Sequence, residues 1–319
     1  MNISIALCTY NGSRYLPEQL DSIARQTQPP TELVFCDDCS SDNTVDIANE
    51  FAKKVTFPVR VFVNERNLRS TKNFERAISL CQGDVIALAD QDDIWMPDKL
   101  AALQNVLVQA PDAGYVFSDA ELVRTDLSPI GYSLWESIGF TASSKRRVLR
   151  GDAFELMLKR YMVTGATMAF RSDYRDLVLP IPQEWVHDAW ISLLISSTAD
   201  CRFVDRPLVR YRQHESQQIG AKKRNLYEQY LIAKQMSLAT YQGVVNNYSL
   251  AHERLAASKK VSPRRIEMLA QKVLHFQNRC KMRAPGSWRL PYILGELVSG
   301  RYSRYSLSIL SLAQDLLLN

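Results

Sequence analysis

The alternation of short β-type runs with helical segments over residues 1–120 most constrains the fold of this 319-residue chain. Runs rich in Val, Ile and Phe predict strands at residues 3–8, 32–36, 59–63, 85–89 and 114–118. Apolar residues at helical spacing predict helices between them, at residues 15–26, 43–53, 71–81 and 98–109. Such alternation builds a mostly parallel sheet with helices on both faces. The sequence therefore predicts an α/β fold.

Polar clusters follow four of the predicted strands, at residues 9–12, 37–40, 64–67 and 90–93. Any one of them is equally typical of a solvated turn, because Asp and Asn favour turns. In open α/β sheets, however, ligands bind beyond the carboxyl ends of the strands. Four polar clusters at one edge of a sheet therefore indicate a binding site.

The last of these clusters places Asp90, Asp92 and Asp93 directly after an apolar run. Three neighbouring carboxylates repel one another, and their hard oxygens are the ligands that Mg²⁺ and Mn²⁺ prefer. The sequence contains neither the Gly-x-Gly-x-x-Gly fingerprint after the first strand nor a Gly-Lys-Ser/Thr phosphate loop. A phosphorylated ligand would therefore need a metal ion or basic side chains to offset its charge.

The net charge of +5 hides a division within the chain. Residues 1–219 hold 23 Lys and Arg against 29 Asp and Glu, a balance of −6, whereas residues 220–319 hold 16 against 5, a balance of +11. Shorter elements are expected at residues 151–159, 167–170, 187–195 and 203–214, and helices from about residue 221. We therefore predict a catalytic unit at residues 1–219 and a basic, mainly helical region at residues 220–319.

The basic region contains an expected helix that starts at Ser262-Pro263, a capping Ser followed by Pro at the first helical position. Its apolar stripe comprises Ile266, Leu269, Val273 and Leu274, and its basic complement comprises Arg264, Arg265, Lys272, Arg279, Lys281 and Arg283. The aromatic residues Trp288, Tyr292, Tyr302 and Tyr305 follow among arginines. This mixture favours an anionic membrane surface as partner. A nucleic acid, an oligomer contact and a merely solvated appendage are the alternatives.

The N-terminal segment has no basic stretch or small-residue cleavage site, so we expect no signal peptide. No apolar run approaches the roughly 18 residues of a membrane span. The six cysteines are scattered, which is typical of reduced thiols. These features predict a cytoplasmic protein, with peripheral contact to the inner face of the plasma membrane through residues 220–319.

Four ordered motifs resemble a known family. They read SIALCTYNGSRYLPEQLDSIARQT, ELVFCDDCSSDNT, NLRSTKNFERAI and GDVIALADQDDIW. In this order and spacing they resemble the inverting family 2 glycosyltransferases, over roughly residues 1–215. Within that family the similarity is greatest to bacterial enzymes that extend surface polysaccharides, including rhamnosyltransferases. One departure is Cys39, which stands where the family usually has Gly, the residue that most easily adopts positive φ.

The resemblance implies a GT-A fold, which is Rossmann-like, with a C-terminal helical appendage. It implies transfer of a sugar from a nucleoside-diphosphate sugar, dTDP-rhamnose or a UDP-sugar, to a hydroxyl of a saccharide acceptor. It also implies inversion at the anomeric carbon, dependence on Mn²⁺ or Mg²⁺, and an acceptor carried on a lipid such as undecaprenyl phosphate. The setting implied is O-antigen, capsule or other cell-surface polysaccharide synthesis.

The resemblance assigns donor-side roles residue by residue. Asp37 or Asp38 matches the acid that reads the pyrimidine N–H. Asp92 is the favoured metal ligand, with Asp90 shared between metal and ribose and His214 as a further ligand. The remaining nucleotide-sugar contacts would come from Thr9, Tyr10, Asn11, Lys72, Asn73, Gln91 and Arg212.

The segment VHDAWISLL resembles the family's acidic-Asp-Trp motif, with His187 in place of the usual Glu. Asp188 would be the general base that deprotonates the acceptor hydroxyl; capping of the following helix is the alternative. The acceptor side would also include Asp93, Trp95, Thr164, Gly165, His187 and Trp190. The two tryptophans have two interpretations: they stack on a sugar, or they are buried in the core.

Three other functions fit parts of the pattern. An Asp-x-Asp phosphohydrolase normally carries its acid pair after the first strand, whereas here the pair follows the fourth. A calcium loop that starts at Asp90 would need Gly at its sixth position and Glu at its twelfth, where Trp95 and Ala101 stand. A non-catalytic protein that binds nucleotide sugars or nucleic acid is the third. The ordered motifs favour the transferase.

Overall fold

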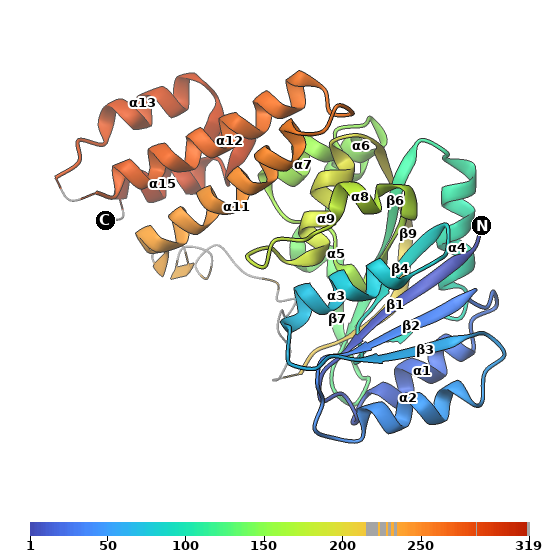
Figure 1. Cartoon of the computed structure of the whole chain (residues 1–319). Coiled ribbons are helices and arrows are strands. Elements are labelled where there is room, and N and C mark those ends of the chain that lie inside the picture. The colour runs from blue at the N-terminus through green and yellow to red at the C-terminus, as the bar shows by residue number, and fades with distance from the viewer. Residues whose placement is uncertain (215–222, 224–227, 229–230, 233–234, 285, 318–319) are drawn as a thin grey trace.

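The structure is a computed structural model, and it describes residues 1–214, 223, 228, 231–232, 235–284 and 286–317. Its centre is a nine-stranded sheet with the order β3-β2-β1-β4-β8-β6-β9-β5, and β7 pairs with β6 (Figure 1). The strands are β1 (Ile3–Thr9), β2 (Glu32–Asp37), β3 (Val59–Val63), β4 (Val85–Ala89), β5 (Ile94–Trp95), β6 (Ala113–Val123), β7 (Pro129–Ser133), β8 (Met168–Arg171) and β9 (Asp200–Arg212). The five strands predicted in residues 1–120 are confirmed.

Strands β1 to β4 are parallel, and β6 and β9 run in the same direction as them. The short strand β8 lies antiparallel between β4 and β6, so the sheet is mixed although most of its strands are parallel. The helices of this unit are α1 (Leu16–Ala24), α2 (Thr44–Ala52), α3 (Arg69–Leu80), α4 (Lys99–Gln109), α5 (Leu134–Ile138), α6 (Ala142–Leu149), α7 (Ala153–Lys159), α8 (Arg175–Val178) and α9 (His187–Ser196), with short 3-10 turns η1 (Gly165–Thr167) and η2 (Ser172–Tyr174).

The sheet has an apolar core on each face, because alternate residues of a strand point to opposite sides. In β4, Ile86 and Leu88 join the core with α3 and α9, whereas Val85 and Ala87 join the core with α1, α2 and α4. All seven residues of β1 are buried, as expected for a central strand covered on both faces. This burial fixes the register and brings the loops after β1, β2 and β4 to the same edge.

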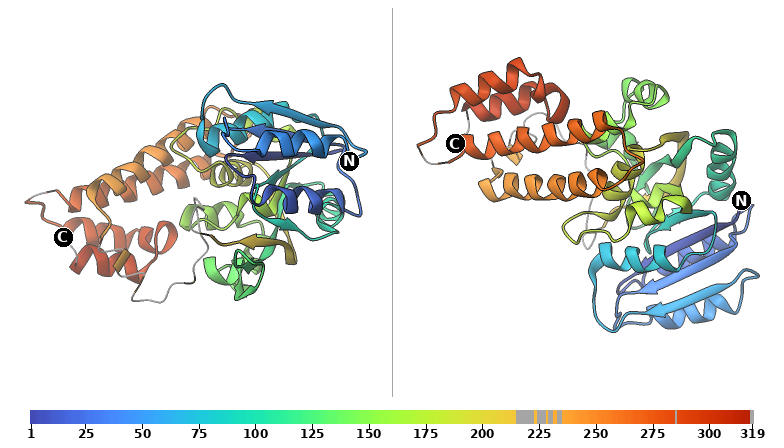
Figure 2. Two further views of the ribbon diagram at one scale, coloured as in Figure 1. Left: turned by 90° about the horizontal axis from the view of Figure 1, so that it is seen from below. Right: turned by 45° about the horizontal axis from the view of Figure 1, so that its top comes forward.

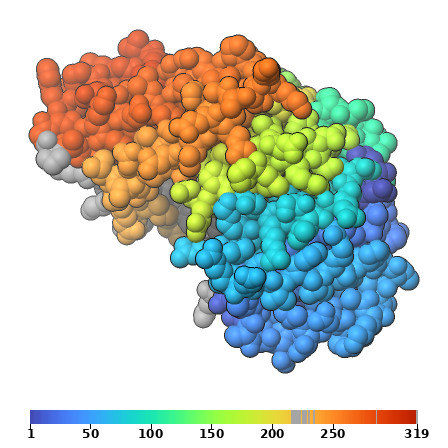
Figure 3. Space-filling view, viewed as in Figure 1, coloured from blue at the N-terminus to red at the C-terminus, as the bar shows by residue number. Residues whose placement is uncertain are grey.

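The C-terminal helices form a lobe that extends from the sheet (Figures 2 and 3). They are α11 (Leu238–Ala256), α12 (Pro263–Met282), α13 (Leu290–Val298), α14 (Arg301–Tyr305) and α15 (Ile309–Leu317). The predicted cap of α12 is confirmed, since the Ser262 side chain accepts a hydrogen bond from the Arg265 N–H. Ala251, Leu255 and Leu269 share a core with α7 and α9, so the lobe packs on the helices that cover one face of the sheet.

The boundary predicted between residues 219 and 220 lies outside the described residues, and the division into two regions stays a prediction. In the described ranges, no helix is both long enough and apolar enough to span a bilayer.

Two residues expected on the solvated basic face of α12 are buried instead. Arg279 is paired with the buried Asp315, with a distance of 2.8 Å between Nε and Oδ2. Lys272 donates a hydrogen bond to the Leu158 carbonyl, and its ammonium lies 3.9 Å from the centre of the Tyr248 ring. Tyr302 and Tyr305 are buried as well. The prediction of a continuous basic and aromatic surface was therefore wrong at these four positions. Helix α15 covers Arg279, α7 and α11 cover Lys272, and α14 packs on α7 and α12.

Burial lowers the pKa of Lys272 from 10.5 to about 7. Between these values the unfolded chain binds a proton that the folded chain does not, so the free energy of unfolding rises with pH from about 7 to 10.5. Lys272→Met is expected to flatten that rise, measured by urea unfolding at several pH values in the window. Lys281→Met, on an exposed residue of the same helix, should keep the wild-type slope. Equal slopes for all three proteins would contradict the assignment.

Candidate active site

A cavity of about 360 Å³ lies at the edge of the sheet where the loops after β1, β2 and β4 meet. Its volume falls in the range typical of small-ligand sites. Ten of the site residues predicted from the sequence line this cavity. They are Thr9, Tyr10, Asp38, Asn73, Asp90, Gln91, Asp92, Thr164, His187 and Asp188. They come from positions up to 179 residues apart. The prediction that polar loops share one edge is confirmed.

The loop after β2 separates the roles of its two acids. Asp37 is fully buried and accepts hydrogen bonds from Thr9 Oγ1 and from the backbone and side chain of Ser40. Asp38 lines the cavity, and its carboxylate is oriented by the N–H groups of Leu68 and Arg69. Of the two candidates for contacting a nucleobase, Asp38 is the one that lines the cavity, whereas Asp37 joins the first two loops.

Cys39 adopts a left-handed backbone conformation with φ of +66°. This is the conformation for which the family pattern uses Gly, and a Cβ makes it less favourable. The turn is closed all the same by Asp37, whose carboxylate accepts the Ser40 N–H at 2.7 Å. Asn11, at φ +47°, completes the neighbouring loop by accepting a hydrogen bond from the Ser41 N–H. The loop geometry therefore persists without the glycine.

Gln91 ties the fourth polar loop to the first. Its side-chain oxygen accepts a hydrogen bond from Tyr10 N, and its side-chain nitrogen donates to Tyr10 O, at 2.8 and 3.1 Å. A Cβ at Gly12 would lie 2.2 Å from the Gln91 Oε1 atom. A side chain at position 12 would displace the Gln91 amide from its hydrogen bonds with Tyr10. Gln91 thus fixes the loop as well as lining the cavity.

The acidic residues after β4 are crowded together and largely buried. Burial, followed by the charges of Asp92 and Asp188, raises the pKa of Asp90 from 3.8 to about 7. Burial and its acidic neighbours also raise the pKa of Asp93 well above its usual range. Asp93 is fully buried and does not line the cavity; its Oδ1 accepts from Arg212 N, and its Oδ2 has no hydrogen-bond partner within the described residues. Its predicted acceptor contact is therefore wrong.

The buried Lys99 lies behind this cluster and was not singled out in the sequence. Its ammonium donates to the Ala166 carbonyl at 2.6 Å and lies 3.4 Å from the centre of the Trp95 ring. Burial lowers the pKa of Lys99, and Asp93 and Asp90 act in the opposite direction. Lys99 consequently links α4 to the η1 turn beside the cavity.

Asp92 and His214 meet across 122 residues of sequence, with 2.7 Å between Asp92 Oδ2 and His214 Nε2. The His214 ring also contacts the Tyr15 ring, with the two ring centres 4.9 Å apart. Two of the three residues that the resemblance names as metal ligands are therefore in direct contact, although His214 is not among the cavity lining.

Asp188 lies in the first turn of α9, which begins at His187. Its Oδ2 accepts a hydrogen bond from the Gly165 N–H at 2.7 Å, and its Oδ1 accepts from the Ala189 N–H at 2.8 Å. Val186 is the N-cap and makes no side-chain cap bond, so Asp188 is not the N-cap residue, although it accepts the first-turn N–H of Ala189. The carboxylate is 5% exposed and faces the cavity, which suits a general base.

His187 lies beside this carboxylate and stacks on Phe74, with 3.9 Å between the ring centres. Both ring nitrogens lack a hydrogen-bond partner within the described residues, and burial lowers the pKa of the imidazole. Gly165 does not line the cavity itself. A Cβ at position 165 would lie 2.8 Å from His187 Nε2. Because Gly165 has no side chain, its backbone can approach His187 closely and its N–H can reach Asp188.

Two predicted cationic contacts are wrong, because these side chains are held elsewhere. Lys72 pairs with Glu75 at 2.7 Å and lines a different, shallow groove. Arg212 is 2% exposed, donates to Glu18 and to the carbonyls of Asp92 and Thr125, and is outside the cavity lining. A different cation, Arg69, lines the cavity from the start of α3.

The two tryptophans predicted to stack on a sugar are buried in the core. Trp95 is 2% exposed and Trp190 is 1% exposed, and neither lines the cavity. The Trp190 Nε1–H donates to the Val178 carbonyl at 2.7 Å. Burial, the alternative considered from the sequence, is therefore what the structure shows.

Sequence reasoning missed two tyrosines of the cavity. Tyr161 lines the cavity on the same side as Asp188. Burial and the carboxylates of Asp93, Asp90 and Asp92 raise the pKa of Tyr211. Tyr211 directly precedes Arg212, which the resemblance singles out, whereas no local pattern marks Tyr161.

The mixed α/β sheet with its acidic cavity at the carboxyl strand ends defines the GT-A class of fold. Residues 4–155 match the family model described as Glycosyl transferase family 2. Over these residues the chain is similar to the family 2 glycosyltransferases.

Among its relatives, the dTDP-rhamnosyl transferase RfbG of Shigella flexneri is 27% identical over 234 residues, which cover 67% of this chain and 74% of RfbG. An uncharacterised protein of Mycobacterium tuberculosis is also 27% identical, over 218 residues, and the match covers 66% of this chain. The chain spans 59% of the length of that relative.

Two solved structures share the fold. Staphylococcus aureus TarS 1–349 in complex with UDP-GlcNAc has a TM-score of 0.62 and 17% identity, over 92% of this chain and 76% of TarS 1–349. The mannosyltransferase PcManGT from Pyrobaculum calidifontis, in complex with GDP-Man and Mn²⁺, has a TM-score of 0.53 and 16% identity, over 99% of this chain and 84% of PcManGT.

Proposed function

We propose that this chain transfers a sugar from a nucleoside-diphosphate sugar to a hydroxyl of a saccharide acceptor, with inversion at the anomeric carbon. The observation that carries the proposal is one cavity lined by Asp38, by the acidic pair Asp90 and Asp92, and by Asp188. This set provides a nucleobase reader, a region for the diphosphate and a base for the acceptor. Similarity to RfbG supports dTDP-rhamnose as donor, with a UDP-sugar as the other candidate.

The proposed acceptor is a growing bacterial cell-surface polysaccharide, carried on a lipid such as undecaprenyl phosphate. Support comes from the names of two relatives, RfbG and the putative teichuronic acid biosynthesis glycosyltransferase TuaG of Bacillus subtilis, which is 28% identical over 128 residues. The match to TuaG covers 40% of this chain and 50% of TuaG.

The donor set at the acidic end of the cavity fits a divalent cation, Mn²⁺ or Mg²⁺. Asp90 and Asp92 line the cavity with the hard oxygen atoms that these cations prefer, and the buried Asp93 Oδ2 has no hydrogen-bond partner within the described residues. No three His, Cys, Asp or Glu side chains of the described ranges are already grouped to hold a metal. Asp92, with Asp90 and His214, would hold the cation, which would supply positive charge to the leaving diphosphate.

The chain's own residues account for the other steps. Asp188 accepts the proton of the acceptor hydroxyl as that oxygen attacks the anomeric carbon. The Gly165 N–H holds one oxygen of the carboxylate in place, and Ala189 N–H holds the other. The attack and the departure of the nucleoside diphosphate occur in a single displacement, so the enzyme needs no nucleophile of its own.

A panel of nucleotide sugars, assayed for nucleoside diphosphate release with Mn²⁺, with Mg²⁺ and with chelator, tests the proposal. Failure to bind or turn over any donor under all metals, with a broad range of acceptors, would remove its support. Asp92→Ala should weaken metal-dependent donor binding by more than the ~10–100-fold typical for loss of a group behind a metal ligand. Asp46→Ala, an exposed carboxylate on α2 outside the cavity, is the control and should bind donor normally.

A further inference from the structure

Helix α15 has the opposite burial pattern to an ordinary surface helix: its polar residues are buried and its apolar residues are exposed. Its buried residues are polar, namely Ser311, Gln314 and Asp315. Its apolar residues are exposed, with Ile309 at 79% and Leu317 at 75% exposure. A surface helix normally turns its apolar stripe to the core. The outer stripe of α15 therefore lacks the apolar contact that such a stripe usually has.

Helix α13 repeats this arrangement. It buries Ile293 and Glu296, and its exposed apolar residues recur at positions i, i+4, i+7 and i+8. Ten of the twenty large hydrophobic residues exposed in the described chain lie within residues 288–317. We call these ten residues the apolar surface of the lobe: Trp288, Leu290, Leu294, Leu297, Val298, Leu307, Ile309, Leu310, Leu316 and Leu317. Concentrated exposure of this kind marks an interaction site.

The carboxylates of the same segment are sequestered inside the lobe. Glu296 is fully buried and pairs with Arg301 and His275, and Asp315 is 1% exposed and pairs with Arg279 and Arg283. They are the two acidic residues among residues 281–317. The solvent-facing charge of that segment, within its described residues, is consequently positive.

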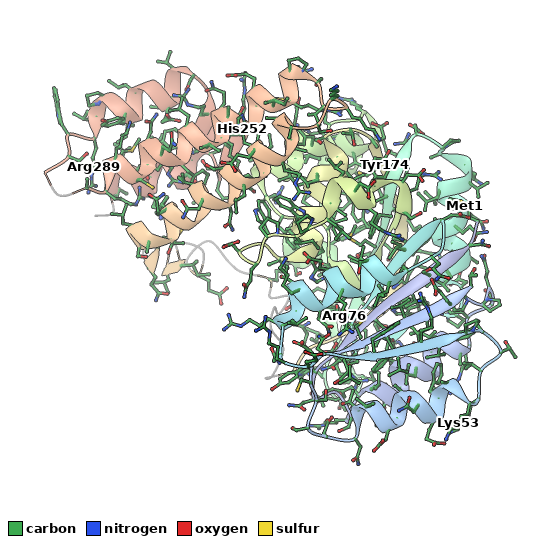
Figure 4. The ribbon with its side chains drawn as sticks, in the orientation of Figure 1. Met1, Lys53, Arg76, Tyr174, His252 and Arg289 are labelled. Carbon is green, nitrogen blue, oxygen red and sulfur yellow. The ribbon has the colours of Figure 1, made fainter. Side chains whose placement is uncertain are left out.

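Basic side chains remain near the apolar surface. Arg304 is exposed, Lys281 is exposed at the end of α12, and Arg289 directly follows Trp288. Arg289 lies at the end of the lobe away from the sheet (Figure 4). An exposed Trp next to Arg, with leucines on neighbouring helices, is the composition of protein surfaces that enter the headgroup region of a bilayer.

We propose that the apolar surface of the lobe binds an anionic lipid bilayer. Charge complementarity favours this occupant over a second copy of the chain, because two copies joined through this surface would bring like charges together. Anionic headgroups would instead attract the basic rim while the leucines and Trp288 enter the interface. The inference is independent of the proposed transfer reaction, since binding to lipid is measured without donor or acceptor.

Flotation of the full chain with phosphatidylglycerol–phosphatidylcholine vesicles tests the proposal. The wild type should float, and raised salt should weaken its binding. The double variant Val298→Asp/Ile309→Asp, at positions 90% and 79% exposed, should bind at least about tenfold more weakly, because two apolar side chains no longer enter the bilayer. The control Val108→Asp/Leu149→Asp changes residues that are 57% and 60% exposed outside the lobe and should float like the wild type.

Trp288 provides a second readout that does not depend on the variants. It is 75% exposed, whereas Trp95, Trp135, Trp185 and Trp190 are each at most 7% exposed. Brominated phospholipid should therefore quench the fluorescence of Trp288, and Trp288→Phe should remove most of that quenching. Absence of flotation, equal flotation of both double variants, or unquenched fluorescence of floating protein would overturn the proposal. A dimer in solution that the Val298→Asp/Ile309→Asp variant dissociates would also overturn it and identify a second copy as the occupant.

Discussion

Asp188→Asn is expected to reduce turnover by ~10²–10⁴-fold while donor binding is retained, because that is the usual contribution of a general base. Asn keeps the shape of Asp and an oxygen that can accept the Gly165 N–H, at present 2.7 Å from Asp188 Oδ2. It lacks the basicity to take the acceptor proton. The substitution therefore separates the chemistry of the residue from its part in the packing of the η1 turn.

The measurement is nucleoside diphosphate release in the presence of acceptor, together with the donor dissociation constant from calorimetry. Asp46→Asn, on the exposed side of α2, is the matched control and should leave both quantities unchanged. A fully active Asp188→Asn protein would remove Asp188 from the role of base. Loss of donor binding along with turnover would instead indicate that Asp188 organises the cavity.

Asp315→Ala is expected to destabilise the protein by about 3–5 kcal/mol, since removal of one partner leaves buried charge uncompensated. Asp315 is 1% exposed and accepts hydrogen bonds from Arg279, Arg283 and Tyr302 at 2.8 to 3.0 Å. Without the carboxylate, two guanidinium groups remain inside the lobe. The loss should appear as a lower midpoint in urea unfolding.

Asp21→Ala is the comparison for that experiment. Asp21 pairs with Arg25 one turn along α1, and their side chains are 66% and 75% exposed. Exposed pairs of this kind contribute about 0–1 kcal/mol, so Asp21→Ala should unfold close to the wild type. Equal midpoints for Asp315→Ala and Asp21→Ala would show that the buried network does not stabilise the lobe.

Local patterns predicted the α/β unit well because its strands are covered on both faces. Continuous apolar runs such as Val85–Ala89 coincide with β4, and the helical periodicity of residues 98–109 coincides with α4 at Lys99–Gln109. Because these strands are parallel, the polar cluster that follows each strand lies at the same edge of the sheet, where the strands have their carboxyl ends. The cavity edge was therefore predictable from residues close together in sequence.

Long side chains were predicted poorly, since their ends reach far from their backbone positions. Arg212 matched the motif but extends to Glu18 and Thr125, and Lys72 turns to Glu75. Arg69, three residues earlier in the chain, lines the cavity instead. The direction of a long cation depends on which acceptors the fold places around it, and spacing in sequence does not contain that information.

The sequence by itself determined where the strands of residues 1–120 lie, the edge at which the polar loops gather and the family that the motifs resemble. These properties depend on periodicity and on short loops, which are local. The tertiary structure alone decided that Asp92 meets His214, that Gly165 contacts Asp188, that Tyr161 lines the cavity on the same side, and that the lobe buries its carboxylates and exposes its leucines. Each of these depends on long-range packing between segments, which fixes burial and direction only after the chain has folded.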